Sequence, residues 1–171
     1  MSANTSIEWA DSTVNESMGC SGCELWQPHK GIRKCYAGAM TERYKGRPGY
    51  PEAFHKVTNF DGRMQQACGW SDLTGKVRPD KPWLDSRPRV IFVDDMGDVL
   101  DPARSVGEVR RRVIEPIASP EGSRHYWLIL TKRAKRLVEL ENELKRAGMK
   151  WPENLGVGVS ITNQGTLARA H

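Results

Sequence analysis

The sequence predicts an α/β fold, a partial parallel (βα) barrel of the TIM type, on three observations. Apolar segments rich in β-branched or aromatic residues occur at 89–93, 126–130 and 155–160, each bounded by turn-forming residues. None of the three alternates with polar residues, which is typical of strands covered on both faces by helices. Their starts lie 37 and 29 residues apart, the length of a strand, a crossover helix and two loops.

Two amphipathic helices are expected in the crossovers. The segment 105–118 carries valines and isoleucines at helical spacing, and Pro116 should shorten its last turn, so we expect this helix to end near Glu115. The segment 135–147 places leucines on one face and charges on the other, and Gly148 supplies the stop.

The N-terminal half predicts fewer regular elements. We expect a short strand at 12–15 and a helix at 36–44, directly after Cys35. Glycines and prolines interrupt the stretch from 45 to 86 repeatedly, so only a short strand near 55–60 and a helix near 61–69 are expected there.

The length of 171 residues suits one domain over 1–171. A helix begins at 166–171 with no closing element after it, so the barrel is expected to be incomplete at the C-terminus, with an unpaired edge on its last strand. We therefore expect the chain to be the N-terminal part of a longer barrel, or a second chain to cover that edge.

Composition narrows the class of protein. Lys and Arg number 26 and Asp and Glu 21, and the net charge of +5 permits a phosphate-bearing partner such as a nucleic acid without requiring one. No run approaches the roughly 18 apolar residues of a membrane span, and the N-terminus lacks the features of a signal peptide. We expect a cytoplasmic protein with no membrane partner.

Three cysteines predict a metal centre. Cys20, Cys23 and Cys35 have the spacing C-x2-C-x11-C, and a disulfide framework is not expected in a reducing compartment. A [4Fe-4S] cluster held by three cysteines leaves one iron open to a substrate or cofactor. Cys35 should lie at the N-terminus of the 36–44 helix, where the helix dipole favours the thiolate. Cys68, far away in sequence, is interpreted as structural.

Zinc is the alternative. His29 lies midway between Cys23 and Cys35, so the segment also fits C-x2-C-x5-H-x5-C. Cys20, Cys23, His29 and Cys35 would form a tetrahedral zinc set. Neighbouring aromatic and basic residues, Tyr36 among them, would then serve a module that binds single-stranded nucleic acid.

Motifs along nearly the whole chain resemble a known family. They are SIEWADSTVN at 6–15, GC at 19–20, CYAG at 35–38, GRM at 62–64, WSDLTG at 70–75, RPDKPWLD at 78–85, RVIFVDDMGD at 89–98, YWLILTKR at 126–133 and NLGVGVSITNQ at 154–164. This pattern resembles the phage-type three-cysteine-motif proteins of unknown function, which look like distant relatives of radical S-adenosylmethionine enzymes such as spore photoproduct lyase.

The resemblance implies an iron-sulfur protein, encoded by a phage or its bacterial host, with a barrel of the radical S-adenosylmethionine type. Cys20, Cys23 and Cys35 would hold a [4Fe-4S] cluster whose open iron binds S-adenosylmethionine for radical chemistry on an unknown substrate. The spacing departs from the C-x3-C-x2-C of those enzymes. A third alternative is a phage accessory protein without catalysis, which works by binding a partner.

Side chains at the carboxyl ends of the strands are the candidates for cofactor binding, because functional groups of parallel barrels gather there. No catalytic residue is assigned. Arg133 offers a bidentate fork to a carboxylate or phosphate, whereas Ser160 and Asn163 suit a ribose or an amino-acid group. The full set of candidates is Tyr36, Asp94, Thr131, Lys132, Arg133, Ser160 and Asn163.

Overall fold

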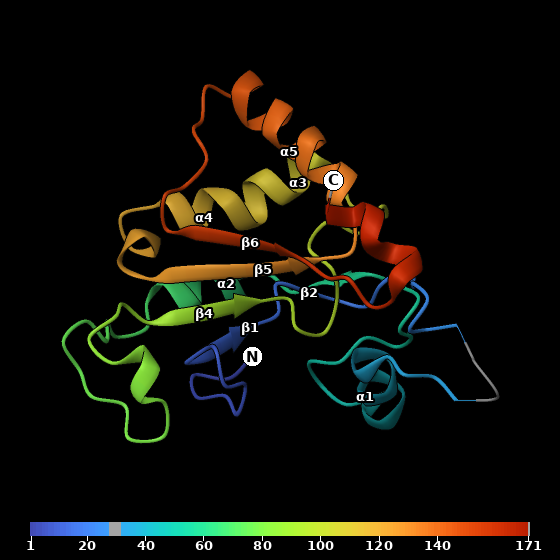
Figure 1. Cartoon of the computed structure of the whole chain (residues 1–171), viewed down its shortest axis with the longest axis horizontal. Helices are drawn as coiled ribbons and strands as arrows, with labels where there is room; N and C mark the ends of the chain where they lie inside the picture. Colours follow the sequence, from blue (N-terminus) through green and yellow to red (C-terminus); the bar gives the residue numbers. More distant parts are fainter. Residues whose placement is uncertain (28–31, 171) are drawn as a thin grey trace.

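A computed structural model describes residues 1–27 and 32–170, and it has a parallel β-sheet with helices packed on it (Figure 1). The strands run in the order β1-β4-β5-β6, and every pairing is parallel. They are β1 (Ser12–Val14), β4 (Val90–Val93), β5 (Tyr126–Thr131) and β6 (Leu155–Val159). The α/β class and the parallel sheet are confirmed. Four such strands are compatible with an open sheet as well as with one part of a barrel.

The crossover from β4 to β5 is one helical run in three parts. It comprises α3 (Val106–Val109), a π-helical turn η2 (Arg110–Ile114) and α4 (Glu115–Ala118). The expected end near Glu115 is wrong, because Pro116 lies in the first turn of α4, where its missing N–H costs little. The wider π turn ahead of it absorbs the irregularity without breaking the run.

The other expected elements lie close to their predicted positions. The helices α1 (Tyr36–Tyr44), α2 (Arg63–Cys68) and α5 (Ala134–Arg146) are confirmed, and Gly148 follows α5 at φ +67°. β3 (Thr58–Asn59) pairs with β2 (Ser17–Met18), which has only two residues and was not predicted. The short 3-10 helices are η1 (Pro82–Leu84), η3 (Gly122–Arg124) and η4 (Gln164–Ala170), the last in place of the helix expected at 166–171.

The main core lies between the sheet and one layer of helices. Side chains from β1, β4 and β5 that share one face, including Ile91 and Trp127, pack against α2, the α3–α4 run and α5. On the opposite face, Val90 and Phe92 are covered by an N-terminal segment and Leu84. Tyr126 and Leu130 on that face are 40% and 38% exposed, so the expectation that every strand is covered on both faces is wrong for β5. No helix in the described part of the chain is long and apolar enough to cross a membrane.

Candidate cysteine site at the carboxyl edge of the sheet

Two glycines bring the loop after β2 into contact with the loop after β4. Gly19 forms a parallel bridge with Gly97, and the Gly19 N–H donates to the Met96 carbonyl at 3.1 Å. A Cβ on Gly97 would lie 2.9 Å from the Gly19 carbonyl oxygen, and Gly19 itself has φ +91°. The two backbones approach this closely only because neither residue has a side chain. Cys20, the next residue, therefore lies beside the carboxyl end of β4.

All three candidate cysteines line one cavity of about 230 Å³ at this edge. Cys20 is buried, and its N–H donates to the Phe54 carbonyl at 2.7 Å. Cys35 is the N-cap of α1, and its sulfur accepts the Gly38 N–H at 3.4 Å. All four cysteines, including Cys68, are free thiols. The fold thus brings together two segments that are separated in the sequence.

The thiols themselves are not arranged as a finished metal site. Among the described residues, no three His, Cys, Asp or Glu side chains are placed to hold one metal ion. Burial raises the pKa of Cys20 to about 12. Burial also raises the pKa of Cys35, and it outweighs the Gly38 N–H, so the thiolate expected at this helix N-terminus is not favoured. Metal binding here would have to release protons from these thiols.

The cysteine loop is held from two sides. The Asp101 carboxylate accepts the N–H of Ser21 at 2.7 Å and its hydroxyl at 2.9 Å. From the end of β5, the Arg133 guanidinium donates to the Gly22 carbonyl, and to the Ser21 hydroxyl at 3.2 Å. These bonds fix the backbone between Cys20 and Cys23 without using either sulfur.

The cavity has an aromatic wall. The rings of Trp26 and Phe54 pack with centroids 4.6 Å apart, and both line the cavity. Trp26 also covers Gly38 of α1 so closely that a Cβ there would lie 2.1 Å from its Cζ3 atom. Tyr36 lines the cavity too, although it is 62% exposed. Such a wall limits the access of water to the sulfurs.

Cations and carboxylates from the strand ends complete the lining. Lys132 and Arg133 contribute from the end of β5, and Asp95 and Asp98 from the loop after β4. Asp98 also accepts the Thr131 hydroxyl at 2.7 Å and the Lys132 N–H at 3.0 Å, so Thr131 is engaged in the turn. Of the predicted cofactor-binding residues, Tyr36, Lys132 and Arg133 line this cavity.

Comparison with known families adds one finding. A family model described as "Protein of unknown function (DUF5131)" matches residues 4–171. The chain belongs to this family. Searches of curated proteins and of solved structures return no match. Membership of a family of unknown function is thus confirmed over nearly the whole chain, whereas nothing in the comparisons supports a relation to radical S-adenosylmethionine enzymes.

Asp94 of this DUF5131 chain lies outside the lining of the cavity. It is fully buried, accepts the Ser17 N–H at 2.9 Å and hydroxyl at 2.6 Å, and pairs with Arg104 at 3.4 Å. Glu16 pairs with the same arginine. In this structure Asp94 therefore joins the end of β4 to β2, with no face open to a ligand.

Ser160 and Asn163 also lie outside the lining of the cysteine cavity. The Ser160 N–H donates to the Thr131 carbonyl, and the Asn163 carbonyl accepts from Thr166. The link from this end of the DUF5131 chain to the cysteine loop comes instead from Arg169, which pairs with Glu24 at 2.8 Å. Hydrogen bonds from Arg169 lower the pKa of Glu24 to about 2.

Sequence reasoning missed some lining residues and named one that cannot be placed. Phe54 carries no sequence signal, because it comes from the irregular stretch before β3. Asp95 and Asp98 were visible as acids following a strand, but their spacing alone does not separate them from Asp94. His29 of the zinc alternative lies outside the described residues, so that alternative stays a prediction.

Proposed function

We propose that the protein binds a [4Fe-4S] cluster through Cys20, Cys23 and Cys35 and uses S-adenosylmethionine at it for radical chemistry on a further substrate. The observation that carries the proposal is the meeting of all three cysteines in one cavity with strand-end cations. The resemblance noted in the sequence points the same way.

The donor set fits such a group. Three thiols that include a C-x2-C pair line one cavity, and thiolates are the usual ligands of iron-sulfur clusters. Cys68 does not compete, because it lies in the core near Pro116, whose carbonyl its thiol contacts at 3.4 Å. A cluster held by these cysteines would supply an electron and a binding position for S-adenosylmethionine.

Lys132 offsets negative charge at the cavity. Its ammonium lines the cavity and acts to lower the pKa of Cys35 against the effect of burial. Three thiolates concentrate negative charge in a small volume, and a nearby cation stabilises them. The same ammonium can bind a carboxylate that enters the cavity.

The chain's other residues hold and shield the site. Arg133 and Asp101 keep the loop between Cys20 and Cys23 in place. The packed rings of Trp26 and Phe54 cover one side of the cavity and would shield an oxygen-sensitive centre there from solvent.

A partial (βα) barrel is the fold that goes with this proposed function. It is supported by the all-parallel order β1-β4-β5-β6 and by polar groups gathered at the carboxyl edge. The apolar face of β5 that helices leave uncovered would be the interior of the barrel.

The test is the metal content of protein purified without oxygen. We expect a brown protein with iron and sulfide near four each per chain. Ala variants of Cys20, Cys23 and Cys35 should each lose most of both, because each removes a ligand. Cys68→Ala is the matched control, since it removes a buried cysteine outside the cavity, and it should keep the iron and sulfide of the wild type.

A colourless protein with one zinc per chain would overturn the cluster. In that case His29→Ala should abolish zinc binding, as the nucleic-acid module requires. A loaded protein that fails to cleave S-adenosylmethionine under reducing conditions would overturn the radical chemistry alone and favour a non-catalytic accessory role.

A further inference from the structure

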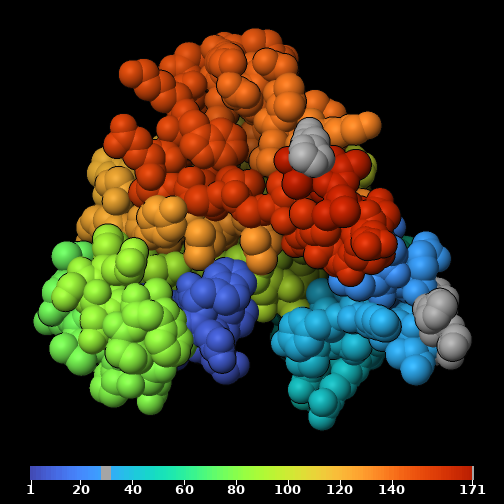
Figure 2. Space-filling view, viewed as in Figure 1, coloured from blue at the N-terminus to red at the C-terminus, as the bar shows by residue number. Residues whose placement is uncertain are grey.

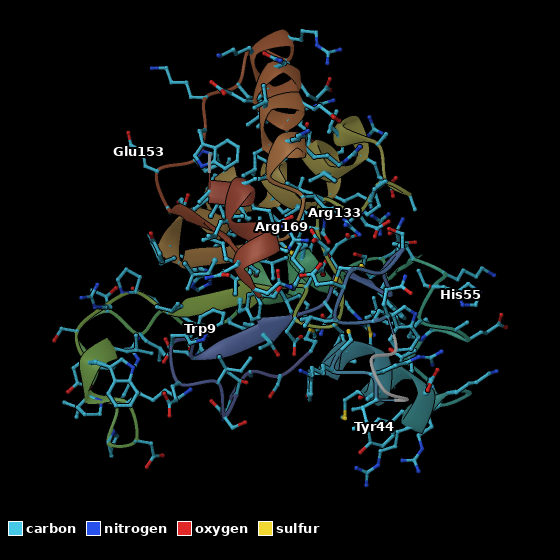
Figure 3. The ribbon with its side chains drawn as sticks, turned by 45° about the vertical axis from the view of Figure 1, so that its right-hand side comes forward. Trp9, Tyr44, His55, Arg133, Glu153 and Arg169 are labelled. Carbon is cyan, nitrogen blue, oxygen red and sulfur yellow. The ribbon has the colours of Figure 1, made fainter. Side chains whose placement is uncertain are left out.

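A second cavity, of about 580 Å³, adjoins the cysteine cavity across Lys132 and Arg133, which line both. It lies between the start of α5 and η4, and Figure 3 shows Arg133 and Arg169 close together there. Figure 2 shows the η4 residues, in red, against the orange residues of α5. Apart from Lys132 and Arg133, no residue of its lining has a role in the proposed function.

Its lining carries five positive charges and no Asp or Glu. The cations are Lys132, Arg133, Lys135, Arg136 and Arg169. Glu24 pairs with Arg169, and Glu139 pairs with Arg136 at 3.2 Å. Lys132, Arg133 and Lys135 have no carboxylate partner within the described part of the chain, so a positive excess faces the cavity.

Unused donors accompany this charge. The Nε atoms of Arg133 and Arg136 are buried and have no hydrogen-bond partner among the described residues. A buried N–H without an acceptor is costly, and both of these side chains line the cavity. The thirteen-residue helix α5 adds its N-terminus, which has no side-chain cap and no acidic residue in its first turn.

We propose that this basic cavity binds the phosphate group of an organic ligand. Phosphate presents several acceptor oxygens and up to two negative charges, which suits clustered guanidinium groups and a helix N-terminus. A carboxylate carries one charge and two oxygens and would leave more of these donors unmatched. The site shares Lys132 and Arg133 with the cysteine cavity, but none of its lining side chains is a cysteine, so phosphate binding does not require the cluster.

The experiment is a titration of the full chain, as purified, with phenyl phosphate, followed by amide NMR. Phenol at equal concentration is the control for binding through the aromatic ring alone, because it lacks the phosphate. We expect saturable shifts at the amides of Ala134 and Lys135, and none with phenol. Lys135→Gln should raise the Kd about threefold or more by removing an exposed cation. Lys145→Gln, at the far end of α5 and 66% exposed, makes the same charge change and should leave the Kd unchanged.

Two results would overturn the site: the absence of saturable shifts, or equal weakening by Lys135→Gln and Lys145→Gln. Arg136→Gln should also weaken binding, but Arg136 donates to the Arg104 carbonyl as well, so Lys135→Gln is the deciding variant. The titration does not depend on iron or sulfide content. A failure here would leave the cluster proposal intact, and a failure of cluster assembly would leave the phosphate site intact.

Discussion

Gly38 shows at the residue scale how the cysteine site is packed. It is buried in the first turn of α1 under the Trp26 ring. Gly38→Ala would drive a methyl group into that ring, so we expect a loss of about 1–3 kcal/mol in the free energy of unfolding, the range for overpacking. Urea denaturation measures this loss.

The neighbouring Ala39→Ser is the control for Gly38→Ala, because Ala39 is exposed on the same helix. It should change the stability by less than about 0.5 kcal/mol. A Gly38→Ala protein as stable as the control would show that Trp26 does not pack on α1 as described.

The buried carboxyl of Asp94 should make the free energy of unfolding depend on pH. Burial raises its pKa from 3.8 to about 7, against the opposing effects of Arg104 and Ser17. Between these values the folded state keeps a proton that the unfolded state has lost, so the contribution of Asp94 to stability falls as pH rises from about 4 to 7. Asp94→Asn removes this titration, whereas Arg104 and Glu16 remain.

Urea denaturation of the wild type and of Asp94→Asn at about pH 4.5 and pH 7.5 measures the difference. We expect the wild type to lose more stability than the variant over this interval. If the two proteins changed equally, the carboxyl would titrate alike in both states, and burial would not govern its pKa.

At the scale of single elements, α5 is held by two leucines. Leu140 and Leu144 are each 1% exposed in the core, whereas Val138 on the same helix is 60% exposed. Leu144→Ala should cost about 2–5 kcal/mol, because it leaves a cavity against the α3–α4 run. Val138→Ala should cost less than about 1 kcal/mol, since its side chain is solvated. Thermal or urea denaturation separates the two, and similar losses would contradict the packing of this helix.

The accuracy with which a helix or strand could be predicted from the sequence depends on its length and on the periodicity of its apolar residues. α5 and the strands at 90–93 and 126–131 have patterns that are local and strong, so they were predicted to within a residue or two. The helical spacing of 105–118 also predicted the run through Pro116, but its end was placed near Glu115, because the π turn that compensates for the proline leaves no signal in the sequence. β2 has two residues and exists only through its pairing with β3.

Some residues of the candidate site could also be predicted from the sequence, and others could not. Cysteine spacing identified the three thiols, and strand ends identified Lys132 and Arg133, because both signals are local. Phe54 lines the cavity from the irregular stretch between α1 and β3, whose path no sequence pattern predicts. Asp94 and Asp98 both follow β4, but only Asp98 lines the cavity. The backbone turns at Asp94, which has φ +56°, and this turn is not visible in the sequence.

At the scale of the whole molecule, the sheet is asymmetric. One face is covered by a layer of helices, whereas on the other face β5 presents Tyr126, Leu128 and Leu130 beside two glycines of β6. A Cβ on Gly156 would lie 2.9 Å from Leu128, and one on Gly158 would lie 2.5 Å from Leu130. The large side chains of β5 therefore lie over the bare backbone of β6 and form a continuous apolar surface.

This surface should bind a hydrophobic dye in the native state, because contiguous exposed apolar patches do so without unfolding. We expect Leu130→Ser to lower the native-state fluorescence of 1-anilinonaphthalene-8-sulfonate by about half, since Leu130 belongs to this surface and is 38% exposed. Val77→Ser removes a side chain that is 76% exposed but belongs to a loop outside this face. It should leave the dye signal unchanged. Equal fluorescence from both variants would show that the dye does not bind at this face of β5 and β6, and would contradict the exposed apolar surface.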